Sequence, residues 1–130
     1  MTFPRPNAPR PTSRACSVRF DVHWLTLTAR IAGDARRDDG ASYEELLTHL
    51  RSYRMPVTVL DLSALEGLTH DSIDALADLS RSLRRRGCEL RIVVGKGEIL
   101  DLLANHRLGS SLPVFSSVDR ARAAPVERVA

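Results

Sequence analysis

The feature of this sequence that most restricts its fold is the segment Val57–Leu62 (VTVLDL), a nearly continuous run of β-branched and apolar residues. A strand with one face in water alternates apolar and polar side chains, whereas this segment is apolar almost throughout. It therefore predicts a strand that is covered on both faces, as in the centre of a sheet with helices packed against it.

The segment that follows predicts a long amphipathic helix, which starts within residues 69–72 and ends at Arg86. Its apolar residues recur at helical spacing: Ile73, Leu76, Leu79 and Leu83. Gly87 directly after the helix is a typical stop, because glycine readily adopts the left-handed conformation that ends many helices.

The rest of the chain alternates between further strand and helix patterns. Strands are expected over 17–23, 24–32, 90–94 and 112–115, and helices over 97–106 and 117–123. Another helix is expected from Ser42, which forms a capping box with Glu45, to Pro56. This order predicts one α/β domain over residues 17–124, with a mixed sheet of about five strands and helices packed on it. A flexible Pro/Arg-rich tail (1–16) is expected before the domain and a frayed C-terminus (125–130) after it.

Composition and charge narrow the classes of function. Aromatic residues make up 5% of the chain, so aliphatic side chains must fill the core, and the net charge is only +3. The run Arg84–Arg86 fits the solvated end of a helix, and no motif for reading nucleic acid accompanies it. The sequence shows neither a membrane-spanning apolar run nor a secretory signal. A cytoplasmic protein is therefore expected, with Cys16 and Cys88 as reduced thiols.

Residues 57–123 resemble the STAS domain family, the α/β modules of anti-sigma-factor antagonists. Members carry an apolar strand ending in Asp-Leu-Ser, here Asp61-Leu62-Ser63, and then an Asp-Ser-Ser/Thr-Gly-Leu turn that opens a helix. An ungapped count from Asp61 places this turn on residues 69–73 (THDSI) and the helix-ending glycine on Gly87. The family's late Gly-Leu pair falls on Arg107-Leu108. The resemblance thus implies a STAS-like fold.

The resemblance also implies that the turn is a regulatory site. In anti-sigma antagonists its second Ser or Thr is phosphorylated by an anti-sigma-factor kinase, and the phosphorylated form releases that kinase. This chain has Asp71 there, with about half the charge of a phosphoserine. Two interpretations stay open: Asp71 or Thr69 caps the helix, or Asp71 locks the domain in one switch state. The hydroxyls of Thr69 and Ser72 are further candidates for phosphorylation.

Catalysis is not expected from this chain. His70, Asp71 and Ser72 are adjacent in sequence, but adjacent side chains at a helix start point in different directions and do not form a triad. The other histidines are scattered along the chain and indicate no metal site: His23, His49 and His106.

The resemblance therefore implies a regulatory binding protein whose contact face includes Thr69, His70, Asp71 and Ser72. The expected partner is an anti-sigma factor with a histidine-kinase-like ATPase domain. No cofactor, nucleic acid or membrane insertion is expected. Other roles of STAS domains stay open, namely an accessory subunit of a lipid or anion transport complex and a stressosome-like scaffold. A homodimer also stays open.

Overall fold

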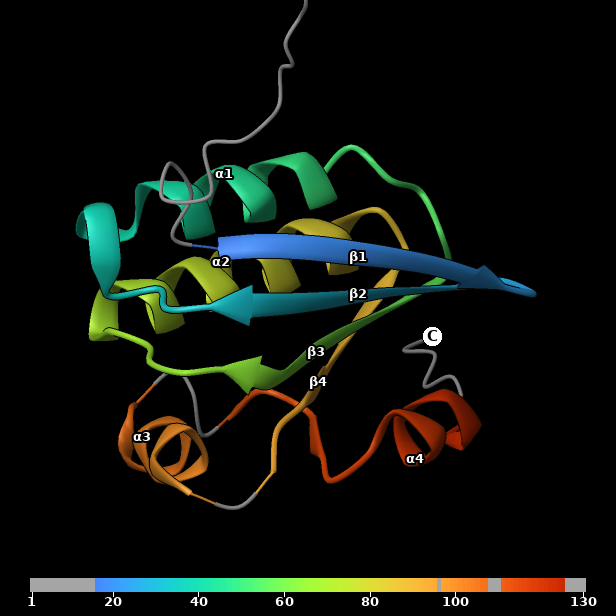
Figure 1. Ribbon diagram of the computed structural model, residues 1–130. Coiled ribbons are helices and arrows are strands. Elements are labelled where there is room, and N and C mark those ends of the chain that lie inside the picture. The colour runs from blue at the N-terminus through green and yellow to red at the C-terminus, as the bar shows by residue number, and fades with distance from the viewer. Residues whose placement is uncertain (1–15, 96, 108–110, 126–130) are drawn as a thin grey trace, which may run out of the picture.

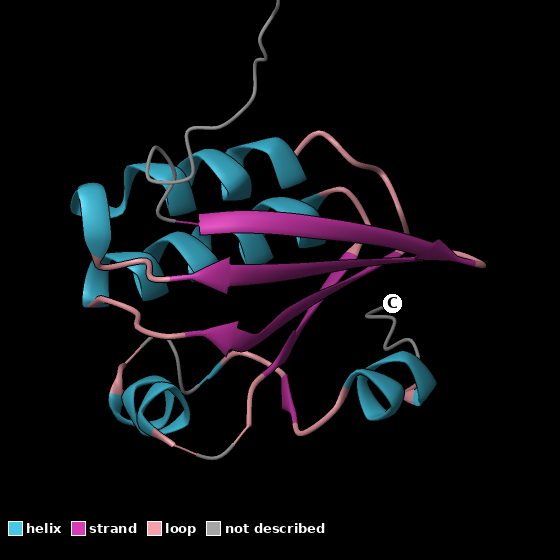
Figure 2. Cartoon of the chain, viewed as in Figure 1, coloured by secondary structure: helices cyan, strands magenta, loops and turns pink. Residues whose placement is uncertain are grey.

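The computed structural model describes residues 16–95, 97–107 and 111–125, which form a five-stranded sheet between two layers of helices (Figure 1, Figure 2). α1 and α2 cover one face of the sheet, and α3 adds Leu103 to the core on that side, while α4 packs against the other face (Figure 1). The predicted α/β domain with a mixed sheet is confirmed. In chain order the elements are β1 (Cys16–His23), β2 (Thr26–Gly33), the short 3-10 helix η3 (Arg37–Gly40), α1 (Ala41–Leu50), β3 (Val57–Leu65), α2 (His70–Arg85), β4 (Glu89–Val93), α3 (Glu98–Asn105), β5 (Val114–Phe115) and α4 (Val118–Ala123).

The strands follow one another across the sheet in chain order, from β1 to β5. β1 pairs with β2 antiparallel and the later neighbours pair in parallel, so β1 and β5 form the two edges. Parallel neighbours need long crossover connections, which contain α1, α2 and α3. Each residue of Val57–Leu62 in the middle strand is buried, which confirms the predicted strand covered on both faces.

Two apolar layers bury β3. On the side of α1 and α2, Leu60 and Leu62 belong to the main core, together with leucines from both helices. On the opposite side, Val57 and Val59 pack with Ala121 of α4 in a smaller core. Full burial of such a side chain is worth about 1.5–3 kcal/mol, so each layer contributes substantially to holding the strand.

The start of α1 differs from the predicted capping box. The helix begins at Ala41, and its N-cap is Gly40, which has a left-handed φ of 80° and makes no side-chain hydrogen bond. Because η3 turns the chain at Gly40, Ser42 lies inside the first helical turn and is buried. The capping box of Ser42 and Glu45 is therefore wrong. The helix also ends at Leu50, before the predicted stop at Pro56.

The hairpin of β1 and β2 reaches beyond the helices at its turn (Figure 1). Cys16, expected in the N-terminal tail, is the first residue of β1 and is buried. Val18 packs against the main core, but Phe20 and Val22 on the same face are 40% and 62% exposed. The turn places Trp24 at a left-handed φ of 57°. The helices therefore cover only the inner end of the apolar face predicted for this strand.

α2 begins and ends close to the predicted positions. Thr69 is its N-cap, and the Thr69 Oγ1 accepts a hydrogen bond of 3.0 Å from the backbone N–H of Ser72. Thr69 Oγ1 also lies 2.9 Å from Ser72 Oγ. At the other end Arg86 is the C-cap, and Gly87 has a left-handed φ of 77°, which confirms the predicted stop.

Arg91 ties α4 and the residues after it to the sheet from inside the protein. Its side chain is 1% exposed and forms an ion pair of 2.9 Å with Glu89 Oε2. Its guanidinium also donates hydrogen bonds of 2.6 Å to the Ala121 carbonyl and 2.9 Å to the Pro125 carbonyl. Pro125, expected in the frayed C-terminus, is thus held in place, while residues 126–130 lie outside the described part of the chain.

Replacing Thr69 with alanine removes the acceptor for the Ser72 N–H and leaves the buried Ser72 hydroxyl without this partner. We expect the free energy of unfolding to fall by about 1–2 kcal/mol, since a lost N-cap costs about 1 kcal/mol and an unsatisfied hydroxyl adds to it. Urea titration followed by circular dichroism measures the change. Thr69→Ser keeps the oxygen and is the control; an equal loss in both variants would contradict this role of the cap.

Replacing Arg91 with leucine leaves Glu89 without its ion-pair partner and two carbonyl groups without a donor. Breaking a buried pair in this way costs about 3–5 kcal/mol, and we expect a destabilisation of that size in the same titration. The control is Arg81→Leu, because Arg81 pairs with Asp78 on the exposed side of α2 and such pairs contribute about 0–1 kcal/mol. Similar losses in the two variants would show that burial of Arg91 is unimportant for stability.

Candidate functional site

The predicted contact residues lie at the start of α2, after the loop that leaves β3 (Figure 1). In α/β sheets this carboxyl edge of the strands is where ligands commonly bind. Two backbone hydrogen bonds tie the loop to the end of β2: Ala35 N donates to Gly67 O (3.0 Å), and Glu66 N donates to Gly33 O (2.6 Å). The start of α2 is therefore fixed relative to the sheet.

Gly67 allows an arginine to lie against this loop. A Cβ atom at Gly67 would collide with the Arg36 guanidinium, so a larger residue there displaces Arg36. Asp34 accepts hydrogen bonds of 2.9 and 2.8 Å from the Arg36 side chain. Hydrogen bonds from the side chain and the backbone of Arg36 lower the pKa of Asp34 to about 2. The ion pair of Asp34 and Arg36 therefore stays charged at neutral pH, and its arginine lies against the outer side of the loop at Gly67.

Asp71 projects outward from the first turn of α2. It is the second residue of the helix and is exposed. Thr69 supplies the N-cap oxygen, which decides between the two capping residues considered from the sequence. The Asp71 carboxylate is therefore not used by the cap. It interacts favourably with the positive end of the helix dipole.

Ser72, by contrast, points into the protein. It is 2% exposed, and its hydroxyl oxygen lies 2.9 Å from Thr69 Oγ1. Thr69 is half-buried, and its oxygen accepts the Ser72 N–H. Phosphorylation of either hydroxyl, as considered from the sequence, would require the first turn of α2 to open. His70 and Asp71 are the exposed members of the predicted contact set.

His70 lies beside a histidine that the sequence left isolated. The ring centroids of His70 and His106 are 5.2 Å apart, and His106 Nε2 lies 3.3 Å from Asp74 Oδ1. His106 is the C-cap of α3, so this cluster joins the end of α3 to the start of α2. The contact could not be predicted from the sequence because it depends on how α3 packs. The only feature of the sequence that could have pointed to this cluster was Asp74, which lies one helical turn after His70.

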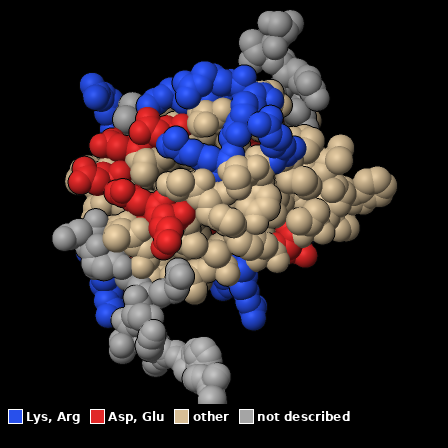
Figure 3. Space-filling view, turned by 90° about the horizontal axis from the view of Figure 1, so that it is seen from above, with Lys and Arg blue, Asp and Glu red and all other residues tan. Residues whose placement is uncertain are grey.

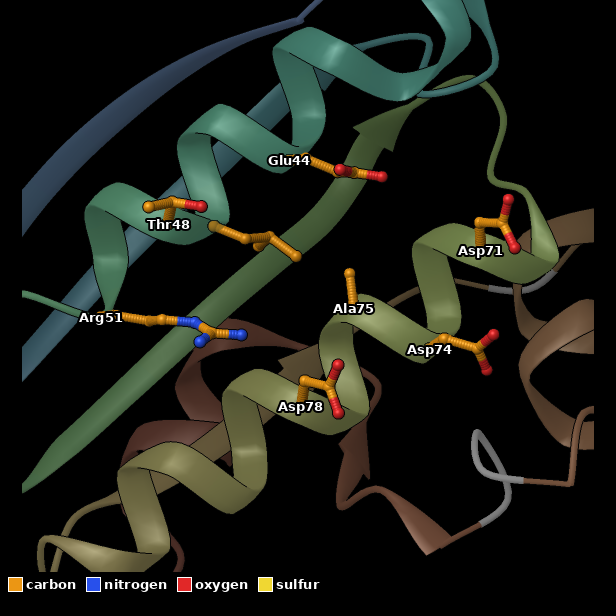
Figure 4. Close-up of a pocket in the computed structure, with 8 residues that line it drawn as sticks. Glu44, Thr48, Arg51, Asp71, Asp74, Ala75 and Asp78 are labelled. Carbon is orange, nitrogen blue, oxygen red and sulfur yellow. The ribbon is translucent and has the colours of Figure 1, made fainter.

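A groove between α1 and α2 opens beside Asp71 (Figure 4). The Glu44 and Arg51 side chains extend from α1, and the three aspartates of the groove recur at helical spacing along α2. Half of the lining residues are carboxylates, so the groove offers a mainly acidic surface. Its lining consists of Glu44, Leu47, Thr48 and Arg51 from α1 and Asp71, Asp74, Ala75 and Asp78 from α2.

The helical face has separate acidic and basic regions. Figure 3 shows the molecule from the side of α1, with carboxylates gathered at one end next to a band of basic side chains. Glu44 lies in the first turn of α1 and Asp71 in the first turn of α2, so the helix starts carry negative charge. The last turn of α2 is basic, and Arg84–Arg86 are exposed, as predicted for the solvated end of a helix.

Other kinds of site are not found in the described part of the chain. No group of three or more His, Cys, Asp and Glu side chains in it is arranged to hold a metal ion. None of its helices has the length and apolar character needed to cross a membrane. Cys16 is buried and Cys88 is half-buried, and neither forms a disulfide in the described structure. Leu108, half of the late Arg107-Leu108 pair, lies outside the described residues.

Solved structures of two anti-sigma factor antagonists share this fold. One, from Mycobacterium paratuberculosis, matches with a TM-score of 0.73 at 18% identity, over 82% of this chain and 91% of that one. The unphosphorylated form of SpoIIAA matches with a TM-score of 0.61 at 10% identity, over 84% of this chain and 99% of that one. At these identities the likeness concerns the fold alone. No curated protein matches the sequence.

A protein-family model identifies the family from the sequence itself. The model of the STAS domain matches residues 29–121, from within β2 to within α4. The matched region contains β3, the turn at 69–73 and α2, which is the segment on which the resemblance rests. The chain belongs to the STAS domain family.

Proposed function

We propose that this protein is an anti-sigma factor antagonist-like regulatory binding protein, which docks on an anti-sigma factor of a partner-switching pathway in the cytoplasm. The observation that carries this proposal is the exposed Asp71, at the usual phosphoacceptor position of a STAS domain and on the edge of an acidic groove. Two proteins with the same fold are anti-sigma factor antagonists, which supports the choice. In this proposal the protein acts by binding and not by catalysis.

The proposed contact surface is the start of α2 together with the groove beside it. Asp71, Asp74 and Glu44 give this surface a negative potential, and His70 adds an exposed ring at its end. A partner with a basic surface would be steered toward it, because complementary charges mainly raise association rates. The family resemblance implies a histidine-kinase-like ATPase domain as the partner, and the acidic groove would require that domain to present arginine or lysine side chains.

Asp71 changes how such a partner would be controlled. A phosphoserine carries a charge of about −1.5 to −2 and can lose it, whereas an aspartate carries a single permanent charge. Phosphorylation at this position therefore cannot switch the protein, and the Asp71 charge adds to that of the groove at all times. We infer that the domain is locked in its binding state. An aspartate that mimics phosphate and holds the protein in the released state is the opposite case.

The loss of the phosphoacceptor also fits two other roles of STAS domains. An accessory subunit of a lipid or anion transport complex does not need a phosphorylated turn, and neither does a stressosome-like scaffold. Asp71 is compatible with both, and self-association is compatible with all three roles. The identity of the partner separates them: a soluble ATPase, a transport complex, or further STAS subunits.

The decisive experiment is affinity purification of the tagged full-length chain from its host, with mass spectrometry of the proteins that co-purify. We expect a histidine-kinase-like ATPase. Subunits of a transporter, or no protein other than the bait, would overturn the proposal and favour the transport role or a switch without its partner.

Replacing Asp71 with asparagine removes one charge while it keeps the size and exposure of the side chain. We expect binding to the purified partner to weaken by about three- to fivefold, because an exposed charge pair contributes up to about 1 kcal/mol. Asp119→Asn is the control, since Asp119 lies in the first turn of α4, on the other side of the sheet. Unchanged affinity would contradict a role for Asp71, and tighter binding would identify Asp71 as a phosphate mimic.

The double substitution Glu44→Gln and Asp74→Asn tests the groove independently of Asp71. Both residues line the groove, from α1 and from α2. We expect the association rate to fall by about an order of magnitude at low salt and the difference to shrink as salt rises, since steering by complementary charge is screened. Stopped-flow or surface plasmon resonance measurements give these rates. An unchanged rate at low salt would place the contact surface elsewhere.

A further inference from the structure

The structure assigns a self-association surface to the outer edge of β1. We propose that two copies of the chain pair through their β1 strands, antiparallel, with the two-fold axis at Phe20. The two sheets then join into one continuous sheet. This inference does not depend on the proposed function, because it concerns the β1 edge and not the start of α2.

The outer edge of β1 is open in the described structure. β1 pairs with β2 on one side only and is the last strand of the sheet (Figure 1). Five consecutive residues, Arg19–His23, are exposed, although alternate residues of a strand point to opposite faces. Exposure on both faces shows that the helices cover this stretch only in part. Such an edge presents unpaired N–H and C=O groups that can pair with another strand.

This edge also carries exposed apolar side chains. All large hydrophobic residues that are exposed in the described part of the chain lie in the β1–β2 hairpin: Phe20, Val22, Trp24 and Leu25. Phe20 is packed only in part, against the rings of His49 and Tyr53, with centroid distances of 6.0 and 5.5 Å. An apolar patch gathered in one place marks an interaction surface more often than scattered apolar residues do.

The charges of β1 favour an axis at Phe20 over the two neighbouring axes at Arg19 and Asp21. Residues directly opposite each other in an antiparallel pair point to the same face, so the apolar face of one copy must meet the apolar face of the other. A two-fold axis at Arg19 would place two arginines opposite each other, and an axis at Asp21 would place two aspartates opposite each other. An axis at Phe20 places Arg19 opposite Asp21 of the second copy, twice.

The same register also matches the apolar residues. It places Val18 opposite Val22 of the second copy and the two Phe20 rings next to each other. These side chains all belong to the face that α1 covers, where His49 and Tyr53 already contact Phe20. The dimer would thus extend an existing aromatic cluster across the two-fold axis and bury the exposed part of Phe20 and Val22.

In the dimer, the charged face of β1 also gains an ion-pair contact that it does not have in a single chain. Arg19 lies directly opposite Arg30 of β2, and like charges in this position are unfavourable. Asp21 is 68% exposed and forms an ion pair of 2.7 Å with Arg122 through Oδ2. Its other carboxylate oxygen faces no cation among the ion pairs of the described residues. In the dimer, Asp21 of the second copy would compensate the Arg19–Arg30 repulsion.

Sedimentation of the full chain over a range of concentrations tests the dimer, and charge reversal tests its register. We expect a reversible dimer with a dissociation constant of about 10–100 μM, typical of a small interface. Arg19→Asp and Asp21→Arg each place like charges opposite each other, and each should weaken the dimer by at least about tenfold. A mixture of R19D and D21R chains restores both opposite-charge contacts, so the mixed dimer should form at wild-type concentrations.

The mixing experiment separates the interface from the fold, because D21R also breaks the contact with Arg122. A mixed dimer forms only if both chains are folded. A wild-type chain that stays monomeric at about 1 mM would overturn the proposal, since even weak interfaces associate at that concentration. A mixture that associates no better than its components would overturn it too.

Disulfide cross-linking checks the position of the axis directly. In a Cys88→Ser background, Phe20→Cys places two thiols opposite each other, with Cα atoms about 4.5–5.5 Å apart, which a disulfide can span. Val22→Cys is the matched control, because Val22 would lie opposite Val18 and not opposite its own copy. We expect oxidation to give a covalent dimer with F20C and little with V22C. The reverse pattern would overturn the proposed register.

Discussion

The burial of β3 on both faces is the constraint on which the rest of this structure depends. Leu60 and Leu62 require an apolar layer on one face of the sheet, while Val57 and Val59 require another on the opposite face. Because β3 runs parallel to β2 and β4, the connecting helices α1 and α2 supply the first layer. The second layer depends on α4, which Arg91 holds through two backbone carbonyls. The buried Arg91 therefore holds α4 against the sheet in addition to the apolar contacts of the second layer.

The position of the candidate site follows from this arrangement. α2 is the crossover from β3 to β4, so its first turn must lie at the carboxyl edge of the sheet. The N-cap at Thr69 fixes the rotation of that turn, and successive residues of a helix point about 100° apart. Ser72 therefore turns inward while Asp71 turns outward. The Asp71 carboxylate is thus exposed at the start of α2 without any change in the fold.

How much could be predicted from the sequence depends on the range of the interaction. The buried run Val57–Leu62 and the stop at Gly87 are local patterns, and both gave the correct elements. The capping box of Ser42 and Glu45 was a local pattern too. The turn before it, however, makes Gly40 the N-cap, so the helix starts two residues earlier than these side chains suggest. The contact of His70 with His106 and the approach of Glu44 to the aspartates of α2 join segments that only packing brings together.

The two proposed surfaces lie on different parts of the molecule, and α1 separates them. α1 contacts β1, whereas α2 contacts β4 and faces α1 across the groove. A two-fold axis perpendicular to the sheet keeps the helices of both copies on one side. A dimer through β1 would therefore present both acidic grooves to the same side. A partner that is itself dimeric could occupy the two grooves together, and the second contact would then form at a high effective concentration. Dimerisation through β1 would in this way raise the overall affinity for such a partner, and binding of the partner would stabilise the dimer.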